Sequence, residues 1–194
     1  MRYARTIAPT ADPITLDEAK AHCNIAGTDE YDDYVAQLIG RAAAAIEKVL
    51  GRQIMPATWA LSLDHFPDEI LLGRPPVSLV SSIYYTDTAG VSTLLVPSQY
   101  QTDLSTPDGP ARIKPAYGLT WPSTQSDKYG AVVVTFTAGY ATQAAVPLAL
   151  KHAVAFLVAH WFRIREPIIT GTTIASISEG LDMLLSLEDW GGYA

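Results

Sequence analysis

The spacing of hydrophobic residues divides the chain into a helical beginning, a long middle of short strands and a second helical stretch. Thr15-Leu16-Asp17-Glu18 matches a capping box, which predicts a short helix that ends at about Cys23. A longer helix is predicted from Asp29 or Glu30 to Gly51, a residue suited to the left-handed end of a helix. Apolar residues recur there every three or four positions, so one face should be buried. They are Tyr31, Val35, Leu38, Ile39, Ala42, Ile46, Val49 and Leu50.

Between residues 54 and 140 the hydrophobic period changes to two. Apolar and small or polar residues alternate in 58–63 and again in 132–137, as they do in half-buried strands. Residues 87–90, Asp-Thr-Ala-Gly, predict a hairpin turn, and the Pro75-Pro76 pair marks a link or an edge strand. The pattern predicts six or seven short strands in a small antiparallel sheet or sandwich.

The helical period returns at Pro147, and the residues from Leu148 to about Arg165 are apolar nearly all round. Such a helix must be covered on every side, either as the central core helix or with part of its surface against another subunit. The candidate residues for this core or subunit contact are His152, Phe156, His160 and Trp161.

These elements predict an α+β protein, a small helical bundle with an inserted antiparallel β domain and an extended C-terminal arm. We assign residues 1–52 to the N-terminal helices, 53–145 to the β domain, 146–167 to the core helix and 168–194 to the arm. The arm has apolar residues without an obvious local partner, so we expect it to order against another chain. A strand or helix packed on its own domain is the alternative.

Charge is scarce for a soluble domain, in which about a quarter of residues are usually charged. Only 17% of the 194 residues are charged, and the 20 acids and 13 bases give a net charge of −7. This composition excludes a disordered chain, a coiled-coil rod and a basic nucleic-acid binder. The longest apolar run is too short for a membrane span, and no secretory signal is expected. The single cysteine, Cys23, makes no internal disulfide and should pack as a small hydrophobic residue.

No known catalytic or phosphate-binding motif occurs in the sequence. The four histidines lack metal-binding spacing, so we expect no catalytic, cofactor or metal site. Two alternatives stay open: a small hydrolase that uses Asp64 or His65, and a carbohydrate- or protein-binding module that uses aromatic residues of the β domain. Those aromatic residues are Tyr84, Tyr85, Tyr100, Tyr117, Trp121, Tyr129 and Tyr140.

A succession of segments, in order along almost the whole chain, resembles the head-to-tail connector proteins (adaptor or head completion proteins) of long-tailed bacteriophages and gene transfer agents. The segments are Ile14 to Lys20, the long helix ending at Gly51-Arg52, Trp59 to Phe66, Leu72 to Val77, Pro115-Ala116-Tyr117-Gly118 with Trp121-Pro122, Val132 to Tyr140, and Pro147 to Glu166. The order of the segments carries the resemblance more than any one of them.

The resemblance implies a structural protein, not an enzyme, at the head-to-tail interface of a virion and in the host cytoplasm during assembly. It implies a ring of about a dozen copies that docks under the portal protein and prolongs the DNA channel. The ring would also offer a surface to a stopper or tail-completion protein. DNA would pass without sequence recognition, and no cofactor or membrane is implied. The helical bundle would build the ring, and the arm would reach the portal. Its candidate anchors are Ile174, Ile177, Leu184, Leu185 and Trp190.

Overall fold

The computed structural model describes residues 1–105, 109–164 and Ser186, and the chain forms two compact units. Residues 1–9 and 56–140 form the first, here called the β unit, and residues 10–55 and 141–194 belong to the second, the helical unit. Residues 1–9 therefore lie with the strands, whereas the sequence analysis placed all of 1–52 with the helices. The reason is a strand at residues 2–7, which pairs with the β unit.

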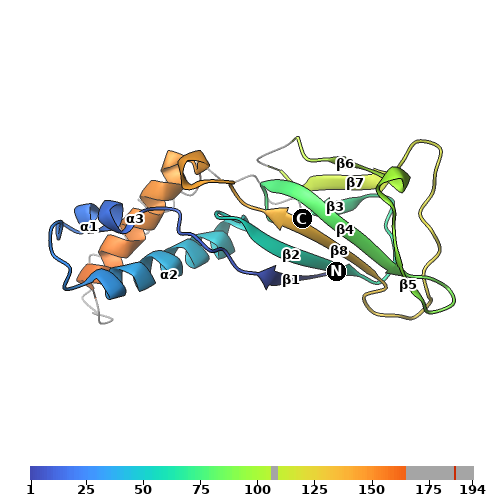
Figure 1. Ribbon diagram of the computed structural model, residues 1–194, viewed down its shortest axis with the longest axis horizontal. Helices are drawn as coiled ribbons and strands as arrows, with labels where there is room; N and C mark the ends of the chain where they lie inside the picture. Colours follow the sequence, from blue (N-terminus) through green and yellow to red (C-terminus); the bar gives the residue numbers. More distant parts are fainter. Residues whose placement is uncertain (106–108, 165–185, 187–194) are drawn as a thin grey trace. The chain divides into compact units, whose positions relative to one another are not determined.

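The helical unit contains α1 (Leu16–His22), α2 (Asp32–Leu50) and α3 (Leu148–Arg163), with a 3-10 turn η2 (Gln143–Ala145) before α3 (Figure 1). The predicted capping box begins α1: the Thr15 hydroxyl accepts from the Glu18 N–H at 3.0 Å, and the Glu18 carboxylate accepts from the Thr15 N–H at 2.7 Å. Gly51 ends α2 in the left-handed conformation, with φ 62°, as predicted.

The amphipathic pattern of α2 predicts its buried face correctly except at one position. Val35, Leu38 and Ala42 are fully or almost fully buried, and Ile39, Ile46 and Leu50 continue the same face. Val49 lies on the same side of the helix as the buried residues, but it is 70% exposed. It lies in the last turn, where the described part of the unit leaves that side of the helix open. The helix begins at Asp32, after the expected Asp29 or Glu30, because Tyr31 has a non-helical backbone conformation.

Within the described residues, α3 is buried on one face only, so this part of the chain does not cover it on every side as a central core helix, and the alternative of a contact with another subunit stays a prediction. Its buried residues repeat at helical spacing and pack in the helical unit, whereas Leu148 at its start is 82% exposed. Two other helices cannot surround a third, so most of its remaining surface is partly exposed. The buried residues of α3 are Leu150, Ala153, Val154, Leu157 and Val158.

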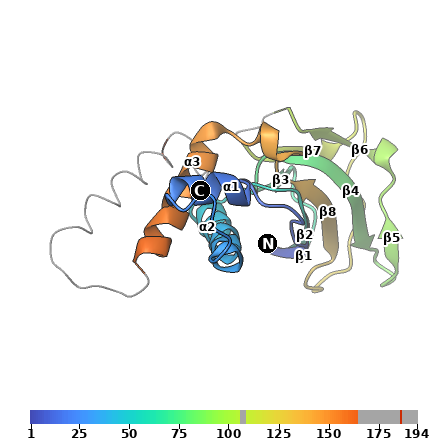
Figure 2. The ribbon, with the colours of Figure 1, turned by 60° about the vertical axis from the view of Figure 1, so that its left-hand side comes forward.

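The β unit is a sandwich of two antiparallel sheets (Figure 1, Figure 2). Its strands are β1 (Arg2–Ile7), β2 (Ala57–Leu63), β3 (Ile70–Leu72), β4 (Val77–Thr86), β5 (Ser92–Leu94), β6 (Tyr100–Asp103), β7 (Ala111–Pro115) and β8 (Val132–Ala138), with a 3-10 turn η1 (Pro97–Gln99) before β6. One sheet has the order β1-β2-β8-β4-β5 and the other β3-β7-β6. The predicted turn at Asp87–Gly90 joins β4 to β5, and Pro75-Pro76 links β3 to β4.

The sandwich core comes from the alternation that the sequence displays. On β8, Val132, Val134 and Phe136 are fully buried, while the residues between them are half-exposed on the other face. Leu72 on β3 and Ile113 on β7 belong to the same core cluster, so the two sheets pack face to face. The edge strand β1 has two arginines and little buried surface, which explains why its sequence does not look like a strand.

Candidate interaction surfaces

Three of the four residues that were expected at a core or subunit contact lie on the open side of α3, and the fourth, Trp161, lies at the end of its buried side. His152 is exposed, and Phe156, His160 and Trp161 are each half-buried. His152, Phe156 and His160 lie away from the buried face of the helix, whereas Trp161, four residues after Leu157, continues that face at the end of α3 next to α2. They are placed where a second molecule can reach them, and their role as a subunit interface stays a prediction.

Aromatic rings continue this open side onto the neighbouring helices. The rings of His22 and His152 pack edge-on with their centres 5.8 Å apart. Those of Tyr31 and Phe162 also pack edge-on, with centres 5.4 Å apart. Beside them a surface depression is lined by Tyr34, Leu38, Arg41, Trp161 and Ile164. The helical unit therefore presents a partly apolar surface with a depression at Trp161.

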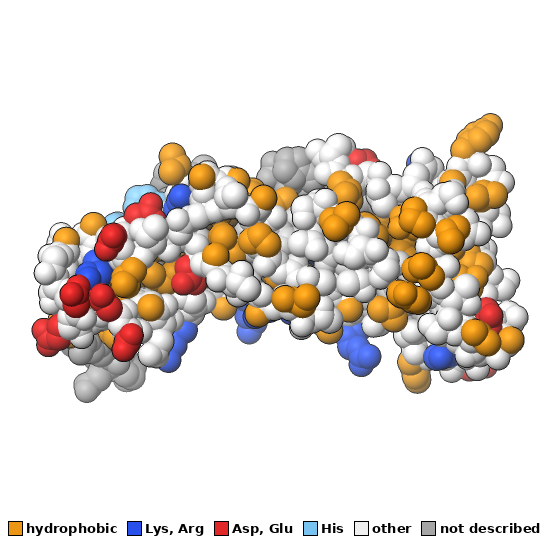
Figure 3. All heavy atoms as spheres, viewed as in Figure 1, with side chains coloured by type: hydrophobic (Ala, Val, Ile, Leu, Met, Phe, Trp, Pro, Cys, Tyr) orange, Lys and Arg blue, Asp and Glu red, His pale blue; other side chains and the backbone are white. Residues whose placement is uncertain are grey.

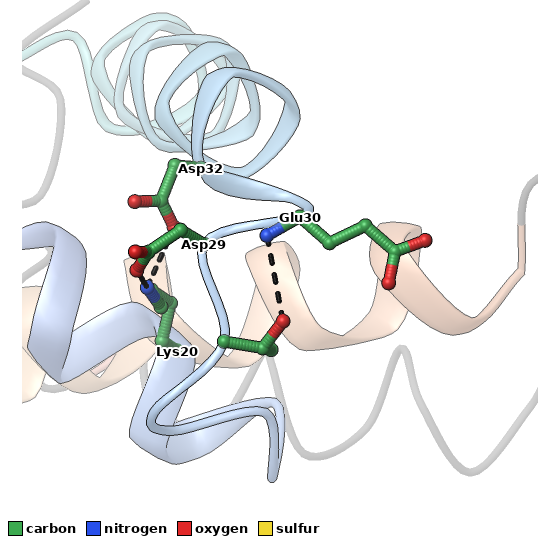
Figure 4. A network of polar contacts seen from close by, with 5 residues as sticks. Lys20, Asp29, Glu30 and Asp32 are labelled. Atoms are coloured by element: carbon green, nitrogen blue, oxygen red, sulfur yellow. Dashed lines mark hydrogen bonds and ion pairs between the residues drawn. The ribbon is translucent and has the colours of Figure 1, made fainter.

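A lysine with its head group between two carboxylates fastens α1 to the start of α2 (Figure 4). The Lys20 side chain is only 7% exposed, and its Nζ lies 2.6 Å from Asp32 Oδ1 and 3.3 Å from Asp29 Oδ1. The ion pair with Asp32, and secondly that with Asp29, raises the pKa of Lys20 above its ordinary value. The acidic residues at the start of α2 thus have a structural role besides their favourable position at the positive helix end.

The raised pKa of Lys20 predicts a pH dependence of stability at alkaline pH. A group whose pKa is raised in the folded state stabilises the fold fully below its ordinary pKa, here near 10.5, and loses this contribution as the pH rises through the folded-state value. We expect Lys20→Met to lower the melting temperature of the helices at neutral pH. The difference from the wild type should shrink above pH 10.5. Circular dichroism at both pH values tests this, with the exposed Lys48→Met as control; an unchanged difference would contradict it.

Two arginines flank a tryptophan at the β1 side of the β unit. The Arg74 guanidinium carbon lies 5.0 Å from the centre of the Trp59 ring, and that of Arg5 lies 5.9 Å from it. The Tyr3 hydroxyl accepts from the Gly73 N–H at 2.8 Å and donates to the Leu71 carbonyl at 3.2 Å. Burial raises the pKa of Tyr3, so the hydroxyl keeps its proton. These contacts fasten β1 to the loop after β3.

The aromatic residues considered for ligand stacking do not form one face. Tyr85, Tyr100 and Trp121 pack against the sandwich core, and Trp121 stacks on Phe66 with ring centres 4.7 Å apart. Tyr84, Tyr117 and Tyr129 are exposed, but Tyr84 is on β4 whereas the other two are in the connection between β7 and β8. Tyr140 is half-buried after β8. The structure therefore uses part of this set for packing, and a binding module stays an alternative without further support.

The residues considered for hydrolysis lie in an exposed depression among loops. Asp64 and His65 line it together with residues 124–129. The Asp64 carboxylate accepts from the Gly130 N–H at 2.7 Å and so holds the loop that precedes β8.

In the helical unit, burial raises the pKa of the Cys23 thiol, which keeps it in the un-ionised, less nucleophilic form. Among the described residues, no group of three or more His, Cys, Asp or Glu is arranged to hold a metal ion.

Several exposed apolar residues at one end of the β unit escaped the sequence analysis. Leu94, Val96 and Leu119 are each about half exposed, and Tyr117 is fully exposed. The sequence signal for them is the absence of charge in the segments around them, which only the structure brings together. The five predicted anchors of the arm, Ile174, Ile177, Leu184, Leu185 and Trp190, lie outside the described residues.

Comparison with protein families gives one match that spans most of the chain. The model of the family described as "HCP: Head completion protein" matches residues 13–175. The chain belongs to the head completion protein family. This confirms the resemblance that the order of segments indicated and identifies the protein as a structural component of a virion. No curated protein matches it.

Solved structures of gene transfer agent (GTA) particles contain chains with the same fold. A chain in the virion of a native GTA particle has a TM-score of 0.79 and 22% identity, with 100% of this chain and 98% of that chain covered. A chain in the neck of an empty particle, computed with C6 symmetry, has a TM-score of 0.73 and 23% identity over 95% of both chains. A third, in the neck of a native particle computed with C12 symmetry, has a TM-score of 0.68 and 21% identity, with 95% and 94% covered.

The family, head completion protein, places the protein in the connection between head and tail. The solved structures share its fold, and the α+β fold class is confirmed. None of the helices in the described part of this head completion protein is long and apolar enough to cross a membrane.

Proposed function

We propose that this head completion protein is a head-to-tail adaptor that forms a ring of about a dozen copies beneath the portal protein. The ring prolongs the DNA channel, and its other side docks the stopper or tail-completion protein. The family match over residues 13–175 carries this proposal. The similar chains in GTA necks, one of them computed with C12 symmetry, support a ring.

Two parts of the chain have distinct roles in this proposal. In α3, the open side with His152, Phe156 and His160, together with the partly exposed Trp161, contacts the neighbouring copy in the ring. The arm, residues 168–194, reaches the portal through Ile174, Ile177, Leu184, Leu185 and Trp190. Partial exposure of large side chains on α3 supports the first role. Four acids and no base in residues 168–194 support contact with a basic portal surface.

The charge of the protein suits a channel through which DNA passes. A polyanion is held by lysines and arginines that neutralise phosphates, and this binding slows movement along it. The net charge of −7 opposes such binding, so DNA slides past without sequence recognition. The protein acts without catalysis and without a cofactor.

The proposal is tested by mixing the purified full-length protein with the portal of the same particle and imaging the mixture by electron microscopy. Rings or portal-bound complexes are expected, and a screen with ester, phosphate and glycoside substrates should show no turnover. Strictly monomeric behaviour in the presence of the portal would contradict an adaptor. Activity that disappears in a His65→Ala or Asp64→Ala variant would favour the hydrolase alternative.

A further inference from the structure

Two segments of the β unit contain no charged residue and no histidine. The first has 15 residues, Thr88 to Thr102, and the second has 12, Pro115 to Ser126. At the chain's average of 17% charged residues, these 27 positions would carry about 4 or 5 charges. The first segment contains the β4–β5 turn after its first residue, Asp87, then β5, η1 and most of β6, and the second contains the end of β7 and the beginning of the connection to β8.

Backbone hydrogen bonds place the two segments side by side. The Ala116 N–H donates to the Gln99 carbonyl at 3.0 Å, which joins the start of the second segment to η1. The Gln125 N–H donates to the Thr86 carbonyl at 3.0 Å, which joins its end to the β4–β5 hairpin. The second segment thus runs along the β5 side of the β unit (Figure 1).

Large apolar side chains point out of this region, which we call the charge-free edge. It is defined by the exposed residues Leu94, Val96, Tyr117 and Leu119. Figure 3 shows hydrophobic side chains gathered at the end of the β unit where β5 lies. Isolated exposed apolar residues are ordinary, whereas a contiguous group of them marks an interaction site.

The most exposed of these side chains is carried by a turn with a defined backbone. Tyr117 is fully exposed at the tip of a turn in which the Leu119 N–H donates to the Ala116 carbonyl at 2.9 Å. Gly118 completes the turn with φ 76°, a conformation that favours glycine. A few residues on, Trp121 is stacked on Phe66 and fixes the following chain. The backbone of this turn therefore does not have to become ordered when Tyr117 contacts a partner.

We infer that the charge-free edge docks the tail-side neighbour in the neck, the stopper or tail-completion protein, through an uncharged, apolar surface of that protein. This inference rests on the proposed function and assigns its third contact to named residues. The proposed contacts with the neighbouring copy and with the portal both use residues of the helical unit. The β unit supplies the remaining partner surface.

The chemistry of the edge decides which kind of partner fits. DNA is excluded because the edge has no cation to neutralise phosphates. A charged protein surface is also unfavourable, since its charges would lose water without gaining a counter-charge. Apolar contacts are not directional, so they tolerate a partner ring of different copy number better than ion pairs do. An exposed tyrosine beside exposed apolar residues is a typical anchor of a protein interface.

The test measures binding of the full-length protein to the immobilised, purified stopper protein. Tyr117→Ser combined with Leu119→Ser should weaken binding roughly tenfold or more, because both anchors are removed. Raising the salt concentration should not weaken wild-type binding, as it would for a contact made by ion pairs. Tyr129→Ser is the matched control: Tyr129 is 91% exposed in the same β7–β8 connection but lies beside Asp127 and Lys128.

A second variant, Tyr117→Glu, changes one fully exposed side chain, cannot disturb the core, and should weaken binding by a similar factor. Both variants should bind the portal and self-associate like the wild type. Wild-type affinity of both variants for the stopper overturns the inference, and so does loss of self-association or portal binding. If the wild type binds none of these partners, the proposed function itself fails, which is a distinguishable result.

Discussion

Replacing Phe136 with alanine is expected to destabilise the β unit by about 3–5 kcal/mol, the usual cost of removing a buried phenylalanine. Phe136 is fully buried in the middle of β8, the strand between β2 and β4. In the sheet it is paired with Trp59 of β2 and with Val80 of β4. Its ring packs edge-on against that of Tyr3, and the ring centres are 6.4 Å apart. A loss of this size is a large fraction of the stability of an ordinary domain.

The fluorescence of Trp59 and Trp121 reports on this unit, and its unfolding midpoint in urea gives the change in free energy. Val133→Ala is the matched control, since Val133 is half-exposed on the opposite face of the same strand. We expect Val133→Ala to lower the free energy of unfolding by less than half as much as Phe136→Ala does. Phe136→Leu should recover part of the lost stability because it refills most of the volume. Equal effects of Phe136→Ala and Val133→Ala would show that the sandwich core is not where the structure places it.

The parts of the fold that the sequence predicts are those whose signal is local. The capping box at Thr15 and the glycine at the end of α2 specify helix boundaries through hydrogen bonds and backbone conformation within a few residues. In β8, the alternation of apolar residues with residues of the other face indicates, within seven residues, a strand that is buried on one face. Each of these features was predicted from its own segment without knowledge of the rest.

Features that depend on distant segments escaped prediction. The strand β1 pairs with β2 more than 50 residues away, and its exposed arginines hide the pattern of a strand. Because α3 is apolar nearly all round, its sequence does not indicate which of its faces packs against α1 and α2. The charge-free edge needs residues near 99 and 116 to meet, and the pairing of β6 with β7 brings their segments together.

The low charge of the chain gains a structural meaning from this comparison. In the sequence, the shortage of charge is visible in the apolar helix from Leu148 and in residues 168–178, which carry no charge at all. The structure adds a third region, the charge-free edge, in the β unit. A protein that is proposed to meet a neighbouring copy, a portal and a stopper needs three surfaces that lose water on assembly, and charged side chains oppose such desolvation.

Deleting residues 168–194 is expected to abolish capture of the portal in a pull-down experiment. The proposal places the apolar anchors and all four acids of the arm in this segment. The arm of one copy is expected to contribute modest affinity, and a ring multiplies that contribution because many copies bind together. Removing it from every copy therefore removes the avidity together with the contact. The melting temperature of α1, α2 and α3 serves as the control for folding.

Two full-length variants separate the contributions of charge and apolar contact in the arm. Neutralising Glu179, Asp182, Glu188 and Asp189 to their amides should weaken portal capture mainly at low salt, where charge attraction acts over the longest distance. Replacing Ile174, Ile177 and Trp190 with serine should weaken it at every salt concentration, because burial of apolar surface is not screened. If the shortened chain captures the portal as well as the full chain does, the portal contact must lie in the described residues, and the open side of α3 becomes its best candidate.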